Sequence, residues 1–207
     1  MSTITFQINT RTRLLDAALA VIRTKGYSAT TVDDLCAKAG VTKGGFFHYF
    51  RSKEELAVAA AEYFSAQADH LFATAPFHDP ADPVERLLAY VNFRQAILLG
   101  ELPNYTCLVG TMVQEVYETH PAICEACNRC ISGHAATLEA DIAEAIAARG
   151  LHPDWTAESL ALYTQAVIQG AFILAKAKHG SQIAADCLDH LRRHLVMLFA
   201  TPGPEMP

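Results

Sequence analysis

The stretch from Thr31 to Leu56 constrains the fold more than any other part of the chain, because it contains two helix starts separated by a glycine turn. Thr31 and Asp34 have the spacing of a capping box, in which a hydroxyl and a carboxylate each bind the other's backbone N–H. Gly40 stands where a left-handed residue usually ends a helix. Thr42 can cap a second short helix. The pattern predicts a helix-turn-helix.

A second capping pattern, Ser52-Lys53-Glu54-Glu55, opens a longer helix after this unit. The apolar residues of that helix are Leu56, Ala60, Tyr63, Phe64 and Leu71. Phe46 and Phe50 are expected in the small core of the helix-turn-helix, whereas Gly44 and Gly45 leave the start of its second helix with little side-chain bulk. A bare helix start can approach a phosphate closely, so DNA binding is the first hypothesis.

The net charge of −6 is divided unevenly along the chain. Up to Lys53 there are eight basic and three acidic residues, a charge of +5, so the remainder carries −11. A basic segment on an acidic body favours one orientation on DNA, because phosphates attract the first and repel the second. Charges that only solvate exposed helix faces would explain many of these residues singly, but not the asymmetry.

The rest of the chain is also expected to be helical, which predicts an all-α protein. Asp82-Pro83-Val84-Glu85 starts a helix through about Leu99. Further helices are expected at residues 102–119 and from Pro121 to Gly150. Two more are expected, one after Asp154 through about Lys178 and one after Gly180 to about Ala200. We therefore expect a helical head at residues 1–53 and a larger helical domain at residues 54–207.

Several protein classes are disfavoured by the sequence. Residues 1–10 are mixed and polar, unlike a secretory signal, so we expect a cytoplasmic protein. The most apolar stretch, residues 160–177, is interrupted by Thr164, Gln165 and Gln169, which favours a buried helix at an interface over a membrane span. No short-range set of nucleophile, base and orienting residue occurs, so we expect no enzyme activity, and no cofactor is implied.

The segment GVTKGGFFHYFRSKEEL resembles the signature of the TetR family of bacterial transcriptional regulators, which reads roughly G-V-S-K-G-x-L-Y-x-H-F-x-S-K-E-x-L. The agreement extends upstream through the segments RLLDAA, residues 13–18, and GYSATT, residues 26–31. About the first quarter of the chain is covered in detail, and the remainder resembles the family in length and helical layout. The resemblance implies a dimeric regulator, usually a repressor, that a small molecule releases from a near-palindromic operator.

The resemblance also implies which residues contact double-stranded DNA. Hydroxyls and amides at two helix starts would contact phosphate, Lys43 would reach a base edge or phosphate, and the other positions would hold the DNA backbone or allow close approach. These residues are Thr31, Thr42, Lys43, Gly44, Gly45, His48, Tyr49 and Lys53. Phe47 departs from the family's usual tyrosine and lacks its hydroxyl. Gly45 replaces a larger residue, so DNA shape should contribute more to recognition.

Leucine-rich stripes at near-heptad spacing mark the last two helices as candidates for a homodimer interface. The stripes could equally pack within one subunit, but the resemblance favours dimerisation, because TetR-like proteins pair these helices in a four-helix bundle. The expected interface residues are Leu160, Val167, Ala171, Leu174, Leu188, Leu191, Leu195 and Leu198.

The middle helices are expected to enclose a small, largely apolar effector, since ligand sites in helical bundles are apolar with a few convergent polar groups. Candidate contacts are Phe64, Asn92, Phe93, Cys107, Met112, Glu115, Val116, Tyr117, Tyr163, Gln165, Gln169 and Phe172. Each apolar candidate could simply be core. Asn92, Gln165 and Gln169 stand in apolar helices, where an unsatisfied amide costs about 1–3 kcal/mol, so each needs a protein, water or ligand partner.

Two alternatives remain open. Cys124, Cys127 and Cys130, with two histidines nearby, could sense metal or thiol state, although three-residue steps along one helix spread these ligands around its surface. Buried cysteine acting as a small apolar residue explains them as well. A helical ligand-binding protein without DNA activity would share the larger domain, but would leave the capped, basic head unexplained.

Overall fold

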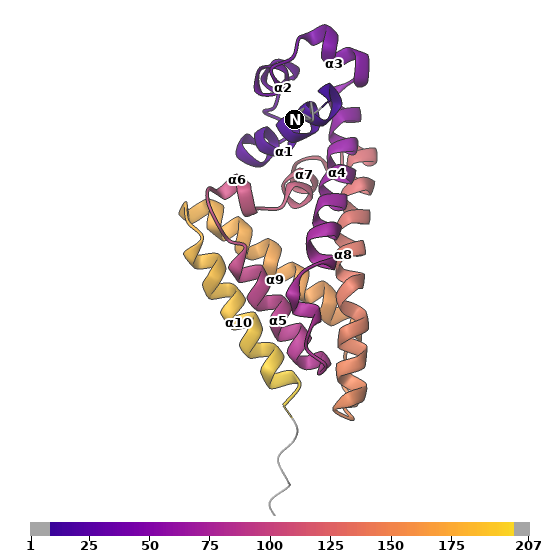
Figure 1. Ribbon diagram of the computed structural model, residues 1–207, viewed down its shortest axis with the longest axis vertical. Coiled ribbons are helices and arrows are strands. Elements are labelled where there is room, and N and C mark those ends of the chain that lie inside the picture. The colour runs from indigo at the N-terminus through magenta and orange to yellow at the C-terminus, as the bar shows by residue number, and fades with distance from the viewer. Residues whose placement is uncertain (1–8, 201–207) are drawn as a thin grey trace, which may run out of the picture. The chain divides into compact units, whose positions relative to one another are not determined.

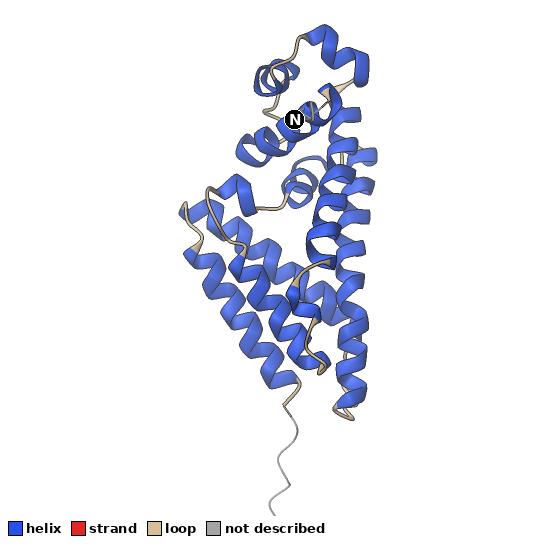
Figure 2. Cartoon of the chain, in the orientation of Figure 1, coloured by secondary structure: helices blue, strands red, loops and turns tan. Residues whose placement is uncertain are grey.

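The computed structural model describes residues 9–200, and every element in that range is helical (Figure 2). The helices fall into two compact units, each built from segments distant in the sequence. The first unit contains α1 (Thr10–Lys25), α2 (Val32–Ala39), α3 (Lys43–Tyr49), most of α4 (Lys53–Ala73), α7 (Leu108–Val116) and the start of α8 (Pro121–Ala148). The expected all-α fold is confirmed.

The second unit takes the end of α4 and the remaining length of α8, with the other helices. These are the 3-10 helix η1 (Pro76–His78), α5 (Pro83–Ala96), α6 (Leu102–Tyr105), α9 (Ala157–Lys178) and α10 (Gln182–Leu198). In Figure 1, α10 runs along α9 and α5, and both pairs are in contact. Leu87, Leu88, Leu188, Leu191 and Leu195 are buried in this unit.

The start and end signals of the two short helices act as the sequence predicts. Thr31 and Asp34 form both halves of a capping box, and Gly40 ends α2 in the left-handed conformation, with φ 63° and ψ 42°. The Thr42 hydroxyl accepts a hydrogen bond from the Gly45 N–H and so caps α3. Phe46 and Phe50 are buried between the first three helices. The predicted helix-turn-helix is present.

Three expected elements differ in detail. The Ser52 hydroxyl accepts from the Glu55 N–H, but the Glu55 carboxylate accepts from the N–H of Arg51, one residue before the position that a capping box requires. The single helix expected at residues 102–119 is broken, because Thr106 is extended and Cys107 starts a new helix. Leu71 is exposed, and the neighbouring Phe72 is the buried residue.

The helix α9 is long and apolar enough to cross a membrane by length and composition alone. Of its most apolar window, 44% is buried inside the protein. Leu160, Ala161, Ile168, Ala171 and Ala175 supply buried side chains, and α9 packs along α10. Core helices of bundles share this composition, so it is weak evidence for a membrane span.

A polar network lies within the apolar core of the second unit. Tyr90, which is 1% exposed, accepts hydrogen bonds through its hydroxyl from Arg94 Nε at 2.9 Å and from Gln165 Nε2 at 3.3 Å. The hydroxyl's own hydrogen is then available to His134 Nε2 at 3.0 Å, which also accepts from Arg94 Nη2 at 3.0 Å. The network therefore assigns the proton of His134 to Nδ1, which leaves the imidazole neutral.

Burial, and to a lesser degree the Arg94 charge, lowers the pKa of His134 to about 3. An unfolded chain binds a proton at this histidine near pH 6.5, and the folded chain does not. Stability contributed by the neutral ring is therefore complete above pH 6.5 and declines as the pH falls toward 3.

Between pH 7 and pH 5, we expect the free energy of unfolding to fall by up to about 2 kcal/mol more in the wild type than in His134→Gln. In this variant an amide replaces the imidazole. Urea titrations of both proteins at the two pH values measure this difference. Equal losses in both proteins would show that His134 is not held neutral by the fold.

Candidate DNA-binding and effector sites

The start of α3 presents two glycines that the fold does not require. Neither Gly44 nor Gly45 has a positive φ. A Cβ built on Gly44 would lie 3.8 Å from the Thr42 hydroxyl oxygen, and one on Gly45 would lie 3.5 Å from it, both ordinary contacts. Glycine lowers helix stability relative to alanine by about 0.5–1 kcal/mol. The two glycines thus leave the start of α3 without side chains, and no contact within the subunit requires glycine there.

The exposed face of α3 carries Lys43, Phe47, His48 and Tyr49, while Phe46 points into the core. Phe47 is 54% exposed, although it is a large apolar side chain. The Phe46 ring meets it edge to face at a centroid distance of 5.1 Å. This face combines one cation, two polar rings and an apolar ring on a short capped helix.

Lys43 pairs with Asp33 of α2 across 2.8 Å, and this hydrogen bond raises the pKa of the lysine. Both side chains are more than 60% exposed, so solvent screens the pair. An exposed pair of this kind is worth at most about 1 kcal/mol, and a phosphate or base edge can replace the carboxylate. Sequence reasoning missed Asp33, because the two residues are ten apart and meet only through the turn.

Two predicted DNA contacts are occupied inside the head. The Thr31 hydroxyl both donates to Asp34 Oδ2, at 2.6 Å, and accepts from the Asp34 N–H. Lys53 Nζ donates to the carbonyls of Tyr27 and Thr30, each at 2.9 Å, and lies 4.1 Å from the Tyr27 ring centroid. Burial lowers the pKa of Lys53. These polar groups hold the loop between α1 and α2.

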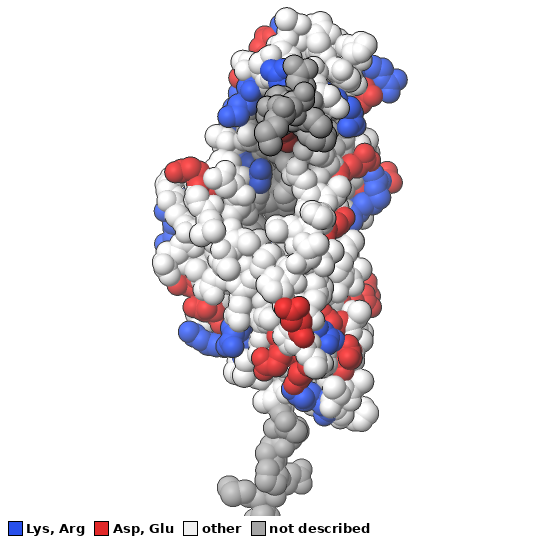
Figure 3. All heavy atoms as spheres, viewed as in Figure 1, with Lys and Arg blue, Asp and Glu red and all other residues white. Residues whose placement is uncertain are grey.

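Basic side chains also fasten the turn and the capping box within the head. Arg13 Nη2 donates to the Gly40 carbonyl at 2.8 Å, and Lys25 pairs with Asp34 at 2.5 Å. On the face drawn in Figure 3, Lys and Arg side chains are scattered over the part that holds α1 to α3. Part of the +5 charge of the head therefore serves its own structure.

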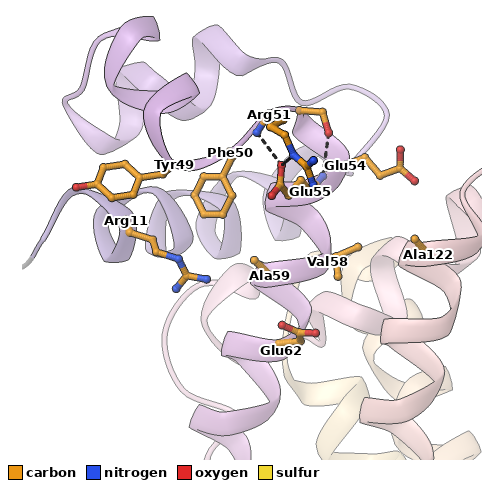
Figure 4. A pocket seen from close by; sticks show the side chains of 11 residues that line it. Arg11, Tyr49, Phe50, Arg51, Glu54, Glu55, Val58, Ala59, Glu62 and Ala122 are labelled. Atoms are coloured by element: carbon orange, nitrogen blue, oxygen red, sulfur yellow. Dashed lines mark hydrogen bonds and ion pairs between the residues drawn. The ribbon is translucent and has the colours of Figure 1, made fainter.

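A surface hollow of about 630 Å³ lies in the first unit, beside the start of α4 (Figure 4). Arg11, Phe50 and Glu54 are among its lining residues, and Arg51 pairs with Glu55 at its edge. The guanidinium of Arg11 lies 5.6 Å from the Phe50 ring centroid. No predicted effector contact lines this hollow.

The twelve predicted effector contacts divide equally between the two units. Asn92, Glu115, Tyr117 and Tyr163 are exposed, so the amide of Asn92 can be satisfied by water. Met112, Val116, Gln165 and Phe172 are buried, and Phe64, Phe93, Cys107 and Gln169 are half-buried. Gln165 has the protein partner that its burial requires, the Tyr90 hydroxyl. Sequence reasoning missed Tyr90, Arg94 and His134, although an arginine in the apolar stretch of α5 was a usable signal.

Glu115 binds the loop between α1 and α2. Its carboxylate accepts from the N–H of Tyr27 at 3.0 Å and from the N–H of Ser28 at 2.8 Å. Gly26 precedes this loop with φ 88°, and a Cβ there would lie 2.5 Å from Glu115 Oε1. The carboxylate thus links α7 to the helix-turn-helix inside the first unit.

The predicted dimer residues are mostly buried within a single chain, the arrangement that the heptad stripes left open. Leu160, Ala171, Leu188, Leu191 and Leu195 are at most 5% exposed. Val167 and Leu198 are half-buried, and Leu174 is 42% exposed. The exposed apolar residues of α9 and α10 are Leu162, Tyr163, Ile173, Leu174, Val196 and Met197. The stripe facing solvent is therefore offset around the helices from the predicted one.

The cysteine run does not gather into a metal site. Within residues 9–200, no group of three or more His, Cys, Asp or Glu side chains could hold a metal ion. Cys127 is fully buried, and burial together with the neighbouring Cys107 raises its pKa to about 12. A thiol with so high a pKa forms little of the reactive thiolate. No disulfide joins any of the six cysteines, all of which lie in the described range.

Comparisons with known proteins give consistent matches. The family model described as bacterial regulatory proteins, tetR family, matches residues 14–60, and that of the tetracyclin repressor-like C-terminal domain matches residues 83–194. Among curated relatives, the transcriptional regulator AcuR of Cereibacter sphaeroides is 31% identical over 103 residues, covering 50% of this chain and 47% of AcuR. The transcriptional repressor DhaR of Mycobacterium sp. is 28% identical over 106 residues, covering 51% and 52%. The chain thus matches about half the length of these two relatives.

Solved structures match over most of the chain. The regulatory protein TetR from Rhodobacter sphaeroides has a TM-score of 0.79 at 25% identity, covering 89% of this chain and 98% of that one. The reduced form of E. coli NemR has a TM-score of 0.76 at 25% identity, covering 93% and 99%. The helical arrangement of this chain is therefore a known one.

Gly44→Ala should raise stability by about 0.5–1 kcal/mol, because alanine favours the helix and its Cβ has room. If the start of α3 touches DNA, the same methyl should weaken DNA binding at fixed salt. Gly133→Ala in α8 is the matched control, since no atom lies within 4 Å of its Cβ. Thermal unfolding and DNA titration separate the two effects; an unchanged DNA affinity in Gly44→Ala would place the DNA contact elsewhere.

Proposed function

Because the chain belongs to the TetR family of bacterial regulatory proteins, we propose that it is a ligand-responsive transcriptional regulator, a repressor released from a near-palindromic operator by a small molecule. The observation that carries this proposal is the capped start of α3, where Lys43 and Gly44 are exposed and little side-chain bulk covers the helix start. Such an end attracts phosphate and can enter a major groove. Several relatives are named transcriptional repressors, including DhaR and KstR2.

In this proposal DNA binding belongs to residues 1–53, and effector binding and dimerisation belong to residues 54–207. Thr42, Lys43, Gly44, Gly45, His48 and Tyr49 form the DNA-facing set, to which we add the exposed Phe47. Thr31 and Lys53 act by holding the loop between α1 and α2 in place, since their polar groups are already bonded there. Lys43 would exchange Asp33 for DNA.

Glu115 supports a route from effector to DNA. An effector can shift an equilibrium only if it binds two conformations with different affinity. The Glu115 carboxylate accepts from two backbone N–H groups of the loop before α2, so a displacement of α7 would be transmitted to the helix-turn-helix. Ligand occupancy would thereby favour a head position that no longer fits the operator.

The exposed apolar stripe of α9 and α10 supports a homodimer. Leu162, Ile173 and Leu174 recur at helical spacing on one side of α9. Tyr163 contacts His194 of α10 at a centroid distance of 5.3 Å, so the exposed parts of the two helices are continuous. Exposed apolar patches of this kind are typical of subunit interfaces. We therefore propose that the dimer contact lies on this exposed stripe, and that the buried leucines of the heptad pattern support it from within the subunit.

The thiol-sensing alternative has weaker support. Cys127, the central residue of the cysteine run, is fully buried with a raised pKa. A regulatory thiol is usually exposed and has a lowered pKa. An organic effector is therefore the better-supported signal.

Selection of binding sequences from random duplex DNA tests the proposed function. We expect a near-palindrome with half-sites one helical turn apart, and Lys43→Ala should cost about 1–3 kcal/mol of affinity for it at fixed salt. Asp33→Asn, which frees Lys43 without removing it, is the control and should retain binding. If no sequence is enriched by the ligand-free protein, the chain is a ligand-binding protein without DNA activity, or it needs a further molecule in order to bind.

Ile173→Glu should convert the dimer to a monomer, because two buried carboxylates would face each other across a two-fold contact. Leu71→Glu is the matched control, since Leu71 is similarly exposed, at 46% against 47%, but lies on α4. Sedimentation equilibrium measures both. A dimeric Ile173→Glu variant would contradict the assigned interface.

A further inference from the structure

The guanidinium of Arg94 has no carboxylate partner within the described residues, although it lies half-buried in the second unit. Two other arginines in that unit are paired. Arg86, on the same helix, binds Asp141 at 2.8 Å and also Glu144, and Arg149 binds Asp82 at 2.6 Å. Charges held away from water are normally paired, because an uncompensated charge is costly. Arg94 is thus half-buried without the carboxylate partner that Arg86 and Arg149 each have.

The groups that do contact Arg94 are neutral acceptors. Its Nε donates to the Tyr90 hydroxyl and one N–H of Nη2 donates to His134 Nε2. A guanidinium has five N–H donors, and among the described residues the two of Nη1 and the second of Nη2 have no protein acceptor. His134 is neutral in this arrangement, and Gln165 donates to the same tyrosine hydroxyl. The network thus holds one positive charge and no negative one.

Aromatic rings surround this charge. The Arg94 guanidinium lies 4.4 Å from the Phe72 ring centroid and 5.4 Å from that of Tyr90. Phe93 meets Phe72 edge to face at 5.5 Å and lies 5.6 Å from Phe77. Both rings lie within cation–π distance of the guanidinium, and neither neutralises its charge. The bonds of Nε and Nη2 hold the planar guanidinium, whose Nη1 and Nη2 donors can bind a carboxylate with two parallel hydrogen bonds.

We propose that the effector is an organic acid with an aromatic or alkyl body, and that its carboxylate binds the fork of Arg94 while its body packs against the rings of Phe72 and Phe93. This inference rests on the proposed function and specifies the chemical class of the effector. It narrows the expectation of a small, largely apolar molecule to that of an apolar molecule with one acid group. The acid supplies the negative charge that the network lacks.

The test uses the full-length protein without DNA and four acids, which are benzoate, phenylacetate, 4-phenylbutyrate and octanoate, each beside its uncharged amide. Isothermal titration calorimetry should detect binding of at least one acid and no comparable binding of its amide. Arg94→Met should weaken that binding by at least about 30-fold, because the charged partner is lost. Arg94→Lys, which keeps the charge without the fork, should weaken it less. Arg51→Met, which removes a charge from the exposed surface of the other unit, should leave it unchanged.

Three results would overturn the proposal: no acid binds the wild type, an acid and its amide bind equally well, or Arg94→Met binds the acid as the wild type does. The comparison of acid with amide needs no variant, so it decides the matter even if Arg94→Met does not fold. The selected operator separates this proposal from the proposed function. If an operator is selected but no acid binds, the proposed regulator is supported and the proposed acid effector is contradicted. If an acid binds but no operator is selected, the acid site is supported and the proposed DNA-binding function is contradicted.

Discussion

The loop between α1 and α2 is the point on which the geometry of the helix-turn-helix depends. Glu115 accepts from two of its backbone N–H groups, and Lys53 donates to two of its carbonyls. Gly26 enters the loop with a positive φ where a Cβ would meet the Glu115 carboxylate. Backbone groups of a loop must be satisfied by something, and here two charged side chains from α4 and α7 do it. The position of α2, and through it of α3, follows from these bonds.

Several basic residues of the head bind partners within the head itself. Lys53 and Arg13 donate to backbone carbonyls, and Lys25 pairs with Asp34 of the capping box. Lys43 differs, because its pair with Asp33 is exposed and exchangeable. A positive charge in a sequence thus has two physical uses, attraction of phosphate and satisfaction of carbonyls. Only the contacts tell them apart.

The second unit shows the same contrast in its interior. Arg86 and Arg149 are neutralised by carboxylates from α8 and from the start of α5. Arg94 instead lies within cation–π distance of aromatic rings and is bonded to a tyrosine and a neutral histidine. Pairing fixes helices to each other, whereas the guanidinium of Arg94 keeps donors that we propose bind an anion. These arginines differ in their partners, which are carboxylates for Arg86 and Arg149 and neutral groups for Arg94.

The sequence by itself determined the helix-turn-helix, its caps and the helical class of the whole chain. The bonds of Thr31, Gly40 and Thr42 reach only a few residues along the chain, so local spacing was sufficient to predict them. Tertiary structure decided which side of α9 faces solvent: Leu160 is buried and Ile173 is exposed. It also brought Glu115 to Tyr27, 88 residues away in the chain, and Arg94 to His134, 40 residues away. Contacts over such separations depend on how helices pack, and helical periodicity alone leaves the rotation of each helix open.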